Sequence, residues 1–132
     1  MGMGFAPLSE KEERIGKAVL EAAFAVHSNL GPGLLESVYG VCLCHELRKH
    51  GFVCQRQVPV PIVYDGVKFD EALRLDVLVE DAVICELKAS ETDNALFLAQ
   101  LLTQLKLTGK RLGYVINFNV PLIKHGIKRV VR

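Results

Sequence analysis

The chain has 132 residues, a length that suits one domain around one hydrophobic core, and we expect residues 1–132 to form a single domain in which residues 1–8 are a loose N-terminus. Half of the residues are hydrophobic, so the chain can bury a core, and disorder is not expected. The formal net charge is only +1, so no global field attracts nucleic acid, and any phosphate-binding surface must come from local clusters of charge.

A first helix is predicted near the start of the chain. Ser9 and Glu12 have the spacing of a capping box, in which each side chain accepts a hydrogen bond from the other residue's backbone. Apolar residues then recur at helical spacing as far as Asn29-Leu30-Gly31-Pro32, where the helix is expected to end.

A second helix is predicted from about Leu34 to His50, with Gly51 ending it. Within it, Glu36 and Tyr39 lie about one turn apart and therefore point the same way. Each also has a structural interpretation: an acidic residue in a first turn complements the helix dipole, and a tyrosine can pack against a sheet. The spacing alone does not decide between these roles and a functional one.

The pattern changes to a period of two after residue 52. Residues 58–64 alternate as a strand does, and Pro59 and Pro61 within this run predict an edge strand or an irregular one. Asp65-Gly66 is a hairpin signal, and Val67 and Phe69 continue on the far side of the turn.

The stretch from Leu75 to Lys88 combines apolar β-formers with ionisable groups. Two runs rich in Val, Leu and Ile flank Glu80-Asp81, which predicts two adjacent strands joined by a tight turn. Because side chains alternate between the faces of a strand, Glu86 and Lys88 must share one face.

Whether Asp76 joins Glu86 depends on the turn. An odd-numbered loop with Asp81 at its centre would place Asp76 opposite Glu86, whereas a two-residue turn would pair Asp76 with Cys85 and separate the carboxylates. Two opposed carboxylates repel unless a cation lies between them, so the first register resembles half of a site for Mg²⁺, which binds one or two carboxylates and substrate phosphate oxygens. The alternative is an ordinary Asp and Glu at the solvated end of a strand, with Lys88 as their salt-bridge partner.

The remaining elements complete an α/β fold. A third helix is predicted from about Asn94 to Thr108, with Gln100 and Gln104 one turn apart, followed by a buried strand over residues 112–118 and a further strand over residues 127–131. We therefore expect a mixed central sheet of about four or five strands with helices on both faces.

Neither a membrane nor a metal-binding cysteine cluster is expected. No apolar run approaches the ~20 residues of a membrane span, no signal peptide precedes the first helix, and Ala6 stands where a myristoylation signal requires Ser or Thr, so a cytoplasmic protein is the default. The four cysteines occupy positions predicted to be buried, and we expect them to be reduced thiols. Cys42 and Cys44 with His45 do not have zinc-ligand geometry on a helix. The cysteines are Cys42, Cys44, Cys54 and Cys85.

The ordered set of motifs resembles the GxxExxY family, a bacterial and archaeal branch of the PD-(D/E)XK nuclease superfamily. The segment 33–39 is a full Gly-x-x-Glu-x-x-Tyr, and it is followed by Asp76 and by Glu86-Leu87-Lys88. The resemblance runs over nearly the whole chain.

The resemblance implies roles for particular residues. Asp76 and Glu86, with the backbone carbonyl of Leu87, would hold a divalent cation, Mg²⁺ or Mn²⁺, and Lys88 would orient or activate the attacking water. Glu36 matches an additional acidic residue that exonuclease-type members bring to the metal. Gln100 matches the first residue of a Gln-x-x-x-Tyr motif that positions substrate.

Two departures from the family pattern affect the third helix. Phe97 stands where members usually carry His, and Gln104 stands where the Tyr of the motif belongs. Metal binding is thus better supported than efficient cleavage. The cysteines also do not follow the pattern of the iron-sulfur relatives in the superfamily, so no such cluster is expected.

We therefore expect a metal-dependent nuclease that hydrolyses phosphodiester bonds, acting on DNA rather than RNA, with a homodimer as an open alternative. Two other functions stay open: a nucleic-acid-binding or regulatory protein with little or no activity, and a structural partner in a complex. Substrate contacts are expected from one group of residues, namely Tyr39, Gln104, Lys106, Lys110, Arg111, Lys124, Lys128 and Arg129. The basic members of this group can also be ordinary solvated surface charges.

Overall fold

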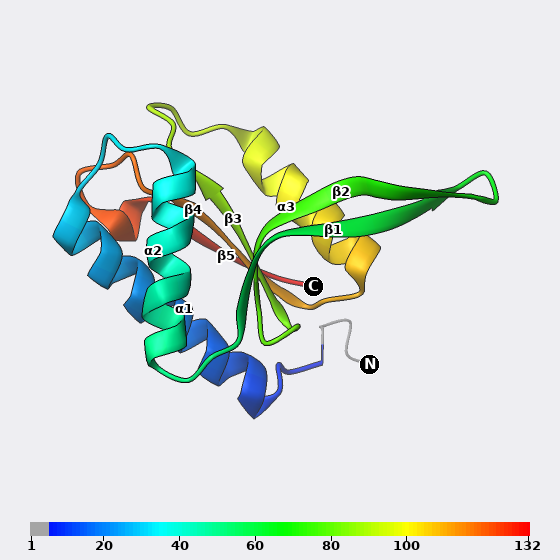
Figure 1. Ribbon diagram of the computed structural model, residues 1–132, viewed down its shortest axis with the longest axis horizontal. Helices are drawn as coiled ribbons and strands as arrows, with labels where there is room; N and C mark the ends of the chain where they lie inside the picture. Colours follow the sequence, from blue (N-terminus) through cyan, green and yellow to red (C-terminus); the bar gives the residue numbers. More distant parts are fainter. Residues whose placement is uncertain (1–5) are drawn as a thin grey trace.

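The computed structural model describes residues 6–132, with the side chains of residues 71 and 72 outside that description. It has the predicted α/β architecture, a mixed five-stranded sheet with helices on both faces (Figure 1). In chain order the elements are α1 (Glu10–Leu30), α2 (Glu36–Lys49), β1 (Cys54–Tyr64), β2 (Val67–Val79), β3 (Val83–Lys88), α3 (Ala95–Thr108), β4 (Leu112–Asn117), the 3₁₀ turn η1 (Ile123–His125) and β5 (Ile127–Val131).

The strands lie in the order β1-β2-β3-β4-β5. Only β3 and β4 run parallel, and α3 makes the crossover between them; the other three pairs are antiparallel. The strand β1 is at one edge of the sheet, as Pro59 and Pro61 predicted, because an edge strand does not need every backbone N–H for pairing.

Two separate cores lie on the two faces of the sheet. Helices α1 and α2 pack on one face, where Val77, Cys85 and Leu87 point inward, and the core extends to Tyr39 on α2. Helix α3 packs on the other face through Leu101 and Leu105. Every side chain on the central strand β3 is therefore covered or half-covered, which explains why its sequence is almost continuously apolar.

The helix ends follow the sequence signals closely. Both hydrogen bonds of the capping box join Ser9 and Glu12 at the start of α1. Asn94 caps α3 by accepting a hydrogen bond from the backbone of Leu96, and Gly109 ends that helix in the left-handed conformation. Helix α2 starts two residues later than predicted, at Glu36, and has no side-chain cap. Among residues 6–132, no helix is long and apolar enough to cross a membrane.

The strands β1 and β2 extend past the rest of the sheet as a two-stranded arm (Figure 1). The turn at its tip is Asp65-Gly66, and both residues have positive φ angles, 54° and 72°, as in a two-residue hairpin turn that matches the twist of the strands. Apolar side chains near the tip, among them Tyr64 and Phe69, are exposed.

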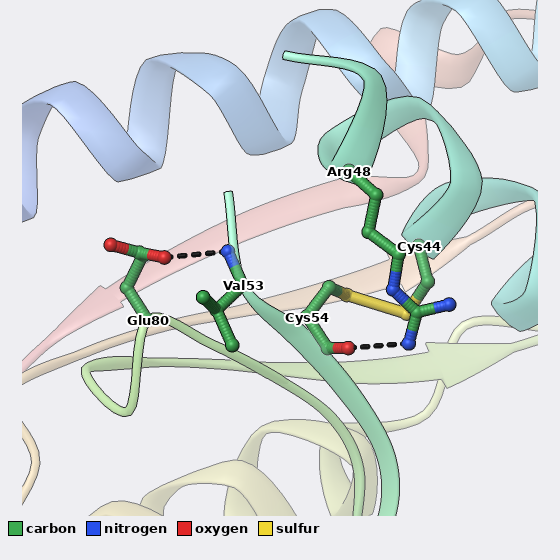
Figure 2. The surroundings of a disulfide bond; sticks show 5 residues. All are labelled: Cys44, Arg48, Val53, Cys54 and Glu80. Carbon is green, nitrogen blue, oxygen red and sulfur yellow. Dashed lines mark hydrogen bonds between the residues drawn. A yellow bond between two sulfur atoms is a disulfide. The ribbon is translucent and has the colours of Figure 1, made fainter. Parts of the chain in front are cut away.

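The expectation of four reduced thiols is wrong for two of the cysteines. Cys44 on α2 and Cys54 at the start of β1 form a disulfide, with their Cα atoms 5.5 Å apart (Figure 2). The short turn between α2 and β1 brings the two residues within disulfide range. Arg48 adds a second tie between the elements by donating a 2.6 Å hydrogen bond to the carbonyl of Cys54. Cys42 and Cys85 are free.

Residues 6–8, the last three of the segment expected to be loose, have no regular secondary structure but contact the rest of the fold. The side chain of Leu8 packs against the core, and the guanidinium of Arg111 donates hydrogen bonds to the carbonyls of Ala6 and Pro7. Arg111 precedes β4, so the first described residues are held against the sheet. Residues 1–5, which make up most of the segment predicted to be loose, lie outside the described residues.

Candidate active site

The pairing of β2 with β3 places Asp76 beside Glu86. Val79 pairs with Val83 and Val77 with Cys85, so the loop between the strands has three residues with Asp81 at its centre, and the next position in the register joins Asp76 to Glu86. Glu80 and Asp81 have positive φ angles of 53° and 52°, which lets three residues reverse the chain. The odd-numbered loop is confirmed, and with it the register that brings the two carboxylates together.

The two strands separate at this point. The ladder between β2 and β3 ends at Val77 and Cys85, while β2 remains paired with β1 and β3 with β4. Beyond the end of the ladder, the side chain of Asp76 connects the two strands, because its Oδ2 accepts a 2.9 Å hydrogen bond from the backbone N–H of Leu87. Asp76 thereby fixes the end of β3, which carries Glu86 and Lys88.

Glu86 is buried, with 7% of its surface exposed, and the pKa of its carboxyl group is raised to about 7, chiefly because burial disfavours the charged form. The neighbouring Asp76 contributes to this rise in pKa through a shared hydrogen bond and through its like charge. The side-chain amide of Gln104, which donates a hydrogen bond to Glu86 Oε2, and the ammonium of Lys88 lower the pKa, and their combined effect is smaller.

Lys88 lies on the same face as Glu86, as alternation along the strand predicted. Its Nζ is 3.8 Å from Glu86 Oε1 and 4.7 Å from the ring centroid of Phe97 on α3, an arrangement that holds a cation over an aromatic face. Phe97 and Gln104, the two residues that depart from the family pattern, therefore contact the Glu-x-Lys pair directly.

The carboxylate pair lies between two cavities. Asp76 lines one cavity of about 240 Å³, together with Glu36, Gly40 and Arg56 from α2 and β1. Glu86 lines another of about 340 Å³ on the α3 side of the sheet, together with Gln100 and Gln104. The side-chain oxygen of Gln100 is buried and has no hydrogen-bond partner within the described residues. Gln100 is thus available to a group that enters beside Glu86.

Glu36 does not complete a cluster of three carboxylates. It is exposed in the first turn of α2 and shares a cavity with Asp76, whereas Glu86 faces the other cavity. Among residues 6–132, no group of three or more His, Cys, Asp or Glu side chains is close enough to hold a metal ion. The expectation that Glu36, Asp76 and Glu86 converge is therefore wrong for Glu36, because α2 begins at the rim of the cavity.

Tyr39 is not placed to contact a substrate. It is fully buried, and its ring stacks on Phe118 with centroids 4.4 Å apart and planes 5° apart. Its hydroxyl donates a 2.6 Å hydrogen bond to the carbonyl of Gly31 and accepts one from the backbone N–H of Leu34. The expected substrate role is corrected to a structural one, since Tyr39 fixes the loop that precedes Glu36. Gln104 is likewise buried behind Glu86 and is not exposed for substrate contact.

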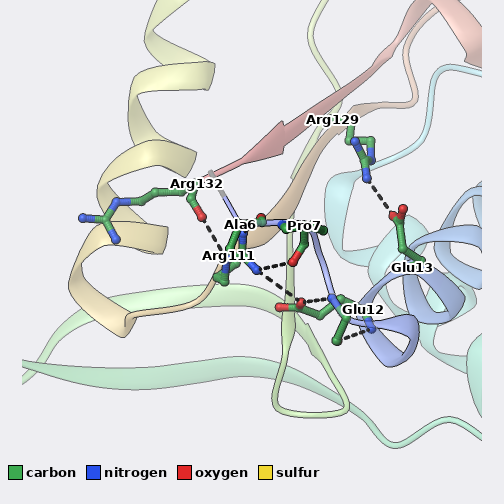
Figure 3. Close-up of polar contacts among 8 residues, drawn as sticks. Ala6, Pro7, Glu12, Glu13, Arg111, Arg129 and Arg132 are labelled. Atoms are coloured by element: carbon green, nitrogen blue, oxygen red, sulfur yellow. Dashed lines mark hydrogen bonds and ion pairs between the residues drawn. The ribbon is translucent and has the colours of Figure 1, made fainter. Parts of the chain in front are cut away.

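Most of the basic residues that were expected to contact substrate form hydrogen bonds or ion pairs with other parts of the protein. Lys110 pairs with Asp81 at 3.3 Å, at the end of β3 opposite to Lys88. Arg111 binds Ala6, Pro7 and the carbonyl of Arg132 and lies near Glu12 (Figure 3). Two further pairs are Arg129 with Glu13 and Lys128 with Asp93. Lys106 and Lys124 are exposed, and neither forms an ion pair within the part of the chain that the structure describes.

Arg56 and Gln57 are the site residues that the sequence analysis missed. Both line the cavity that contains Asp76 and Glu36. A signal was present in the alternation of β1, because counting back from Val58 and Val60 places the charged Arg56 at a position expected to be covered; in the structure Arg56 faces α2, whereas Val58 and Val60 pack on the α3 side. Without the position of α2, that signal does not point to a site.

Comparison with known families identifies the chain. A family model described as the PD-(D/E)XK nuclease superfamily matches residues 13–130. Comparisons with curated proteins and with solved structures give no significant match. The matched segment contains Asp76, Glu86 and Lys88 in the order that gives the superfamily its name, on the strands where the structure brings them together. The chain belongs to the PD-(D/E)XK nuclease superfamily.

Proposed function

We propose that this protein is a Mg²⁺- or Mn²⁺-dependent nuclease that hydrolyses phosphodiester bonds of nucleic acid, DNA in preference to RNA. The observation that carries the proposal is the pairing of Asp76 with the buried Glu86 at the divergence of β2 and β3, with the Lys88 ammonium 3.8 Å from Glu86. A structural salt bridge would not require a second carboxylate to be forced against the first.

The donor set fits a hard divalent cation. Asp76 and Glu86 supply carboxylate oxygens, and the pKa of Glu86 is raised first by burial and then by the neighbouring Asp76, so a cation between the two groups would stabilise their charged forms. Mg²⁺ takes one or two carboxylates in such sites and keeps several waters. The cation would be held by Asp76, Glu86 and the carbonyl of Leu87, and when bound it would lower the pKa of water and offset charge on the phosphate.

The protein's own residues would orient the reacting groups. Lys88 presents an ammonium that can donate hydrogen bonds to an attacking water or to a phosphate oxygen, and the Phe97 ring restricts where that ammonium lies. Gln104 holds one carboxylate oxygen of Glu86, which leaves the other to face Lys88. Gln100, with its unpaired amide oxygen in the same cavity, would position the substrate.

Within the superfamily we assign the chain to the GxxExxY type. The Gly-x-x-Glu-x-x-Tyr segment supports this assignment, since Tyr39 bonds to the loop on which the motif glycine lies. We also propose that the chain is a single domain that acts in the cytoplasm, and that a homodimer is compatible with its activity.

Cleavage assays test the nuclease proposal. We expect labelled single- or double-stranded DNA to be cleaved with Mg²⁺ or Mn²⁺, with RNA cut more slowly. Activity should disappear with a chelator and in Lys88→Ala, and it should persist in Lys17→Ala, which removes an exposed lysine on α1. Failure of the wild type to cleave any of these substrates, or full activity in Lys88→Ala, would refute the proposal.

The second candidate function is nucleic-acid binding through the nuclease fold with little or no cleavage. Phe97 and Gln104, which replace the His and Tyr of the family pattern, support it because both contact the Glu-x-Lys pair directly. Retention of labelled DNA by the wild type without cleavage, in Mn²⁺ as well as Mg²⁺, would favour this function over the first.

A further inference from the structure

An arginine lies at the wall of the cavity next to the carboxylate pair. Arg56 on β1 pairs in register with Val77, the residue that follows Asp76, and its side chain lines the same cavity as Asp76 and Glu36. The position places a permanent positive charge within the candidate site and close to Asp76, on the α2 side of the sheet.

The guanidinium of Arg56 is incompletely satisfied. Its Nε is buried and has no hydrogen-bond partner within the described residues, and Arg56 takes part in no ion pair there. Buried donors of charged groups are expensive to leave unpaired, and arginines in such places normally bind a carboxylate or a phosphate. Arg56 therefore has unused capacity to bind an anion.

Helix α2 has a glycine, Gly40, at the position where the Arg56 side chain packs against it. A Cβ atom at Gly40 would lie 3.1 Å from Arg56 Nε and 3.6 Å from its Nη2, so the guanidinium packs directly over the glycine backbone. A larger residue at position 40 would push the guanidinium away from the cavity. Gly40 is one helical turn from Glu36, so the same helix face provides the rim carboxylate and the space for the arginine.

The backbone next to Arg56 is also irregular. Gln57 has a φ angle of 54°, a conformation that a non-glycine residue rarely adopts, and the β1–β2 pairing omits Gln57 and Asp76 while continuing on both sides. Retained strain of this kind is typical of functional sites. The irregularity lies directly beside Asp76 and follows the residue that carries the unsatisfied guanidinium.

We propose that Arg56 binds a phosphate oxygen of the nucleic acid and so holds the backbone beside Asp76 and Glu86; this inference rests on the proposed nuclease function. A phosphodiester supplies two acceptor oxygens that match the planar donors of a guanidinium. Arg56 on the α2 side and Lys88 on the α3 side then provide positive groups on both flanks of the carboxylate pair. This compensates locally for a net charge of only +1.

Direct binding without a metal tests the proposal independently of cleavage. Fluorescently labelled duplex DNA is titrated with wild type, Arg56→Gln, Arg56→Lys and Arg14→Gln in a chelator over a range of salt concentrations. Arg14→Gln is the control, because it removes the same charge from an exposed position on α1, over Phe52. Arg56→Gln should bind about tenfold or more weakly than wild type, with the salt slope reduced by about 0.9, the value for one lost phosphate contact. Arg56→Lys should restore the salt slope but only part of the affinity, since an ammonium lacks the planar fork.

The outcomes separate this inference from the proposed function. If wild type cleaves DNA and Arg56→Gln binds no more weakly than Arg14→Gln, the role of Arg56 is refuted while the nuclease proposal stands. If wild type neither binds nor cleaves, both are refuted. Thermal melting with and without Mn²⁺ shows whether each variant is folded; should Arg56→Gln not fold, Arg56→Lys decides, and binding equal to that of wild type would refute the inference.

Discussion

The carboxyl group of Glu86 lies among groups that act on its charge in opposite directions. Burial and Asp76 favour the protonated form, and Gln104 and Lys88 favour the carboxylate. The result is a pKa of about 7, so a metal ion that requires the carboxylate competes with a proton near neutral pH. Alternation along β3 predicts the shared face of Glu86 and Lys88, but it cannot predict this balance, which depends on the depth at which α3 packs.

The first prediction concerns stability in a chelator. The pKa of Glu86 is raised in the folded state, so between about pH 4.5 and pH 7 the folded protein keeps a proton that the unfolded chain has lost. The free energy of unfolding contributed by this group therefore falls as pH rises through that window, by at most about 1.4 kcal/mol per pH unit. In Glu86→Gln the free energy of unfolding should not show this fall with pH, and above pH 7 the variant should be at least as stable as wild type. Urea denaturation of both proteins at pH 5 and pH 8 measures the change in the free energy of unfolding. An equal pH dependence in wild type and Glu86→Gln would contradict the prediction.

The second prediction concerns Gln104. Its amide donates to the Glu86 carboxylate, so Gln104→Leu should raise the pKa of Glu86 further and weaken Mn²⁺ binding at pH 7. At pH 8.5, where the carboxylate dominates in both proteins, the difference should shrink. Calorimetric Mn²⁺ titration at the two pH values measures it, with Gln55→Leu at an exposed position of β1 as the control. A deficit independent of pH would show that Gln104 acts on packing alone.

At the scale of elements, the site is formed where β2 and β3 diverge and where α2 and α3 each approach one side. The helices and the strand pair were predictable because their apolar periodicity is strong and Ser9, Asn94 and Gly109 mark their ends. The register was not, because it depends on whether the turn has two residues or three, which Glu80-Asp81 does not decide. The Cys44–Cys54 disulfide also escaped prediction, since the distance between the cysteines is set by the turn that joins α2 to β1.

The third prediction concerns the loop before α2. Tyr39→Phe keeps the stacking on Phe118 but leaves the carbonyl of Gly31 and the N–H of Leu34 without their partner. We expect the free energy of unfolding to fall by about 1–2 kcal/mol, and cleavage to fall with it because the loop leads into the first turns of α2, which line the cavity that contains Asp76. Tyr64→Phe, at a position 73% exposed on the hairpin arm, should change neither quantity. Equal stability of Tyr39→Phe and wild type would mean that water replaces the hydroxyl without cost.

At the scale of the whole molecule, opposite charges are largely paired within the fold. The ion pairs Arg129–Glu13, Lys128–Asp93 and Lys110–Asp81 are on the surface, where such pairs add little to stability. Their consequence here is that these basic groups are less available to a phosphate backbone. Composition predicts that local groups must provide binding, and sequence proximity selected residues near the end of α3, whereas the tertiary fold brings Arg56 to the site from β1.

The last prediction tests the metal site in the intact protein without reference to substrate. A cation that binds only the folded state should raise the melting temperature, with a stabilisation of about 2.7 kcal/mol at ~100 times its dissociation constant. Because the pKa of Glu86 is about 7, the shift produced by a fixed millimolar Mn²⁺ concentration should be larger at pH 8 than at pH 6. Glu86→Gln should lose the response at both pH values, whereas Lys88→Ala should keep it, because removal of a positive charge 3.8 Å from Glu86 does not weaken cation binding.

Thermal melts of the three proteins with Mn²⁺ and with a chelator provide the comparison. A wild type without a Mn²⁺ shift, or a Glu86→Gln variant strongly destabilised in the chelator, would show that Asp76 and Glu86 serve as structural partners of Lys88 and would refute the metal site.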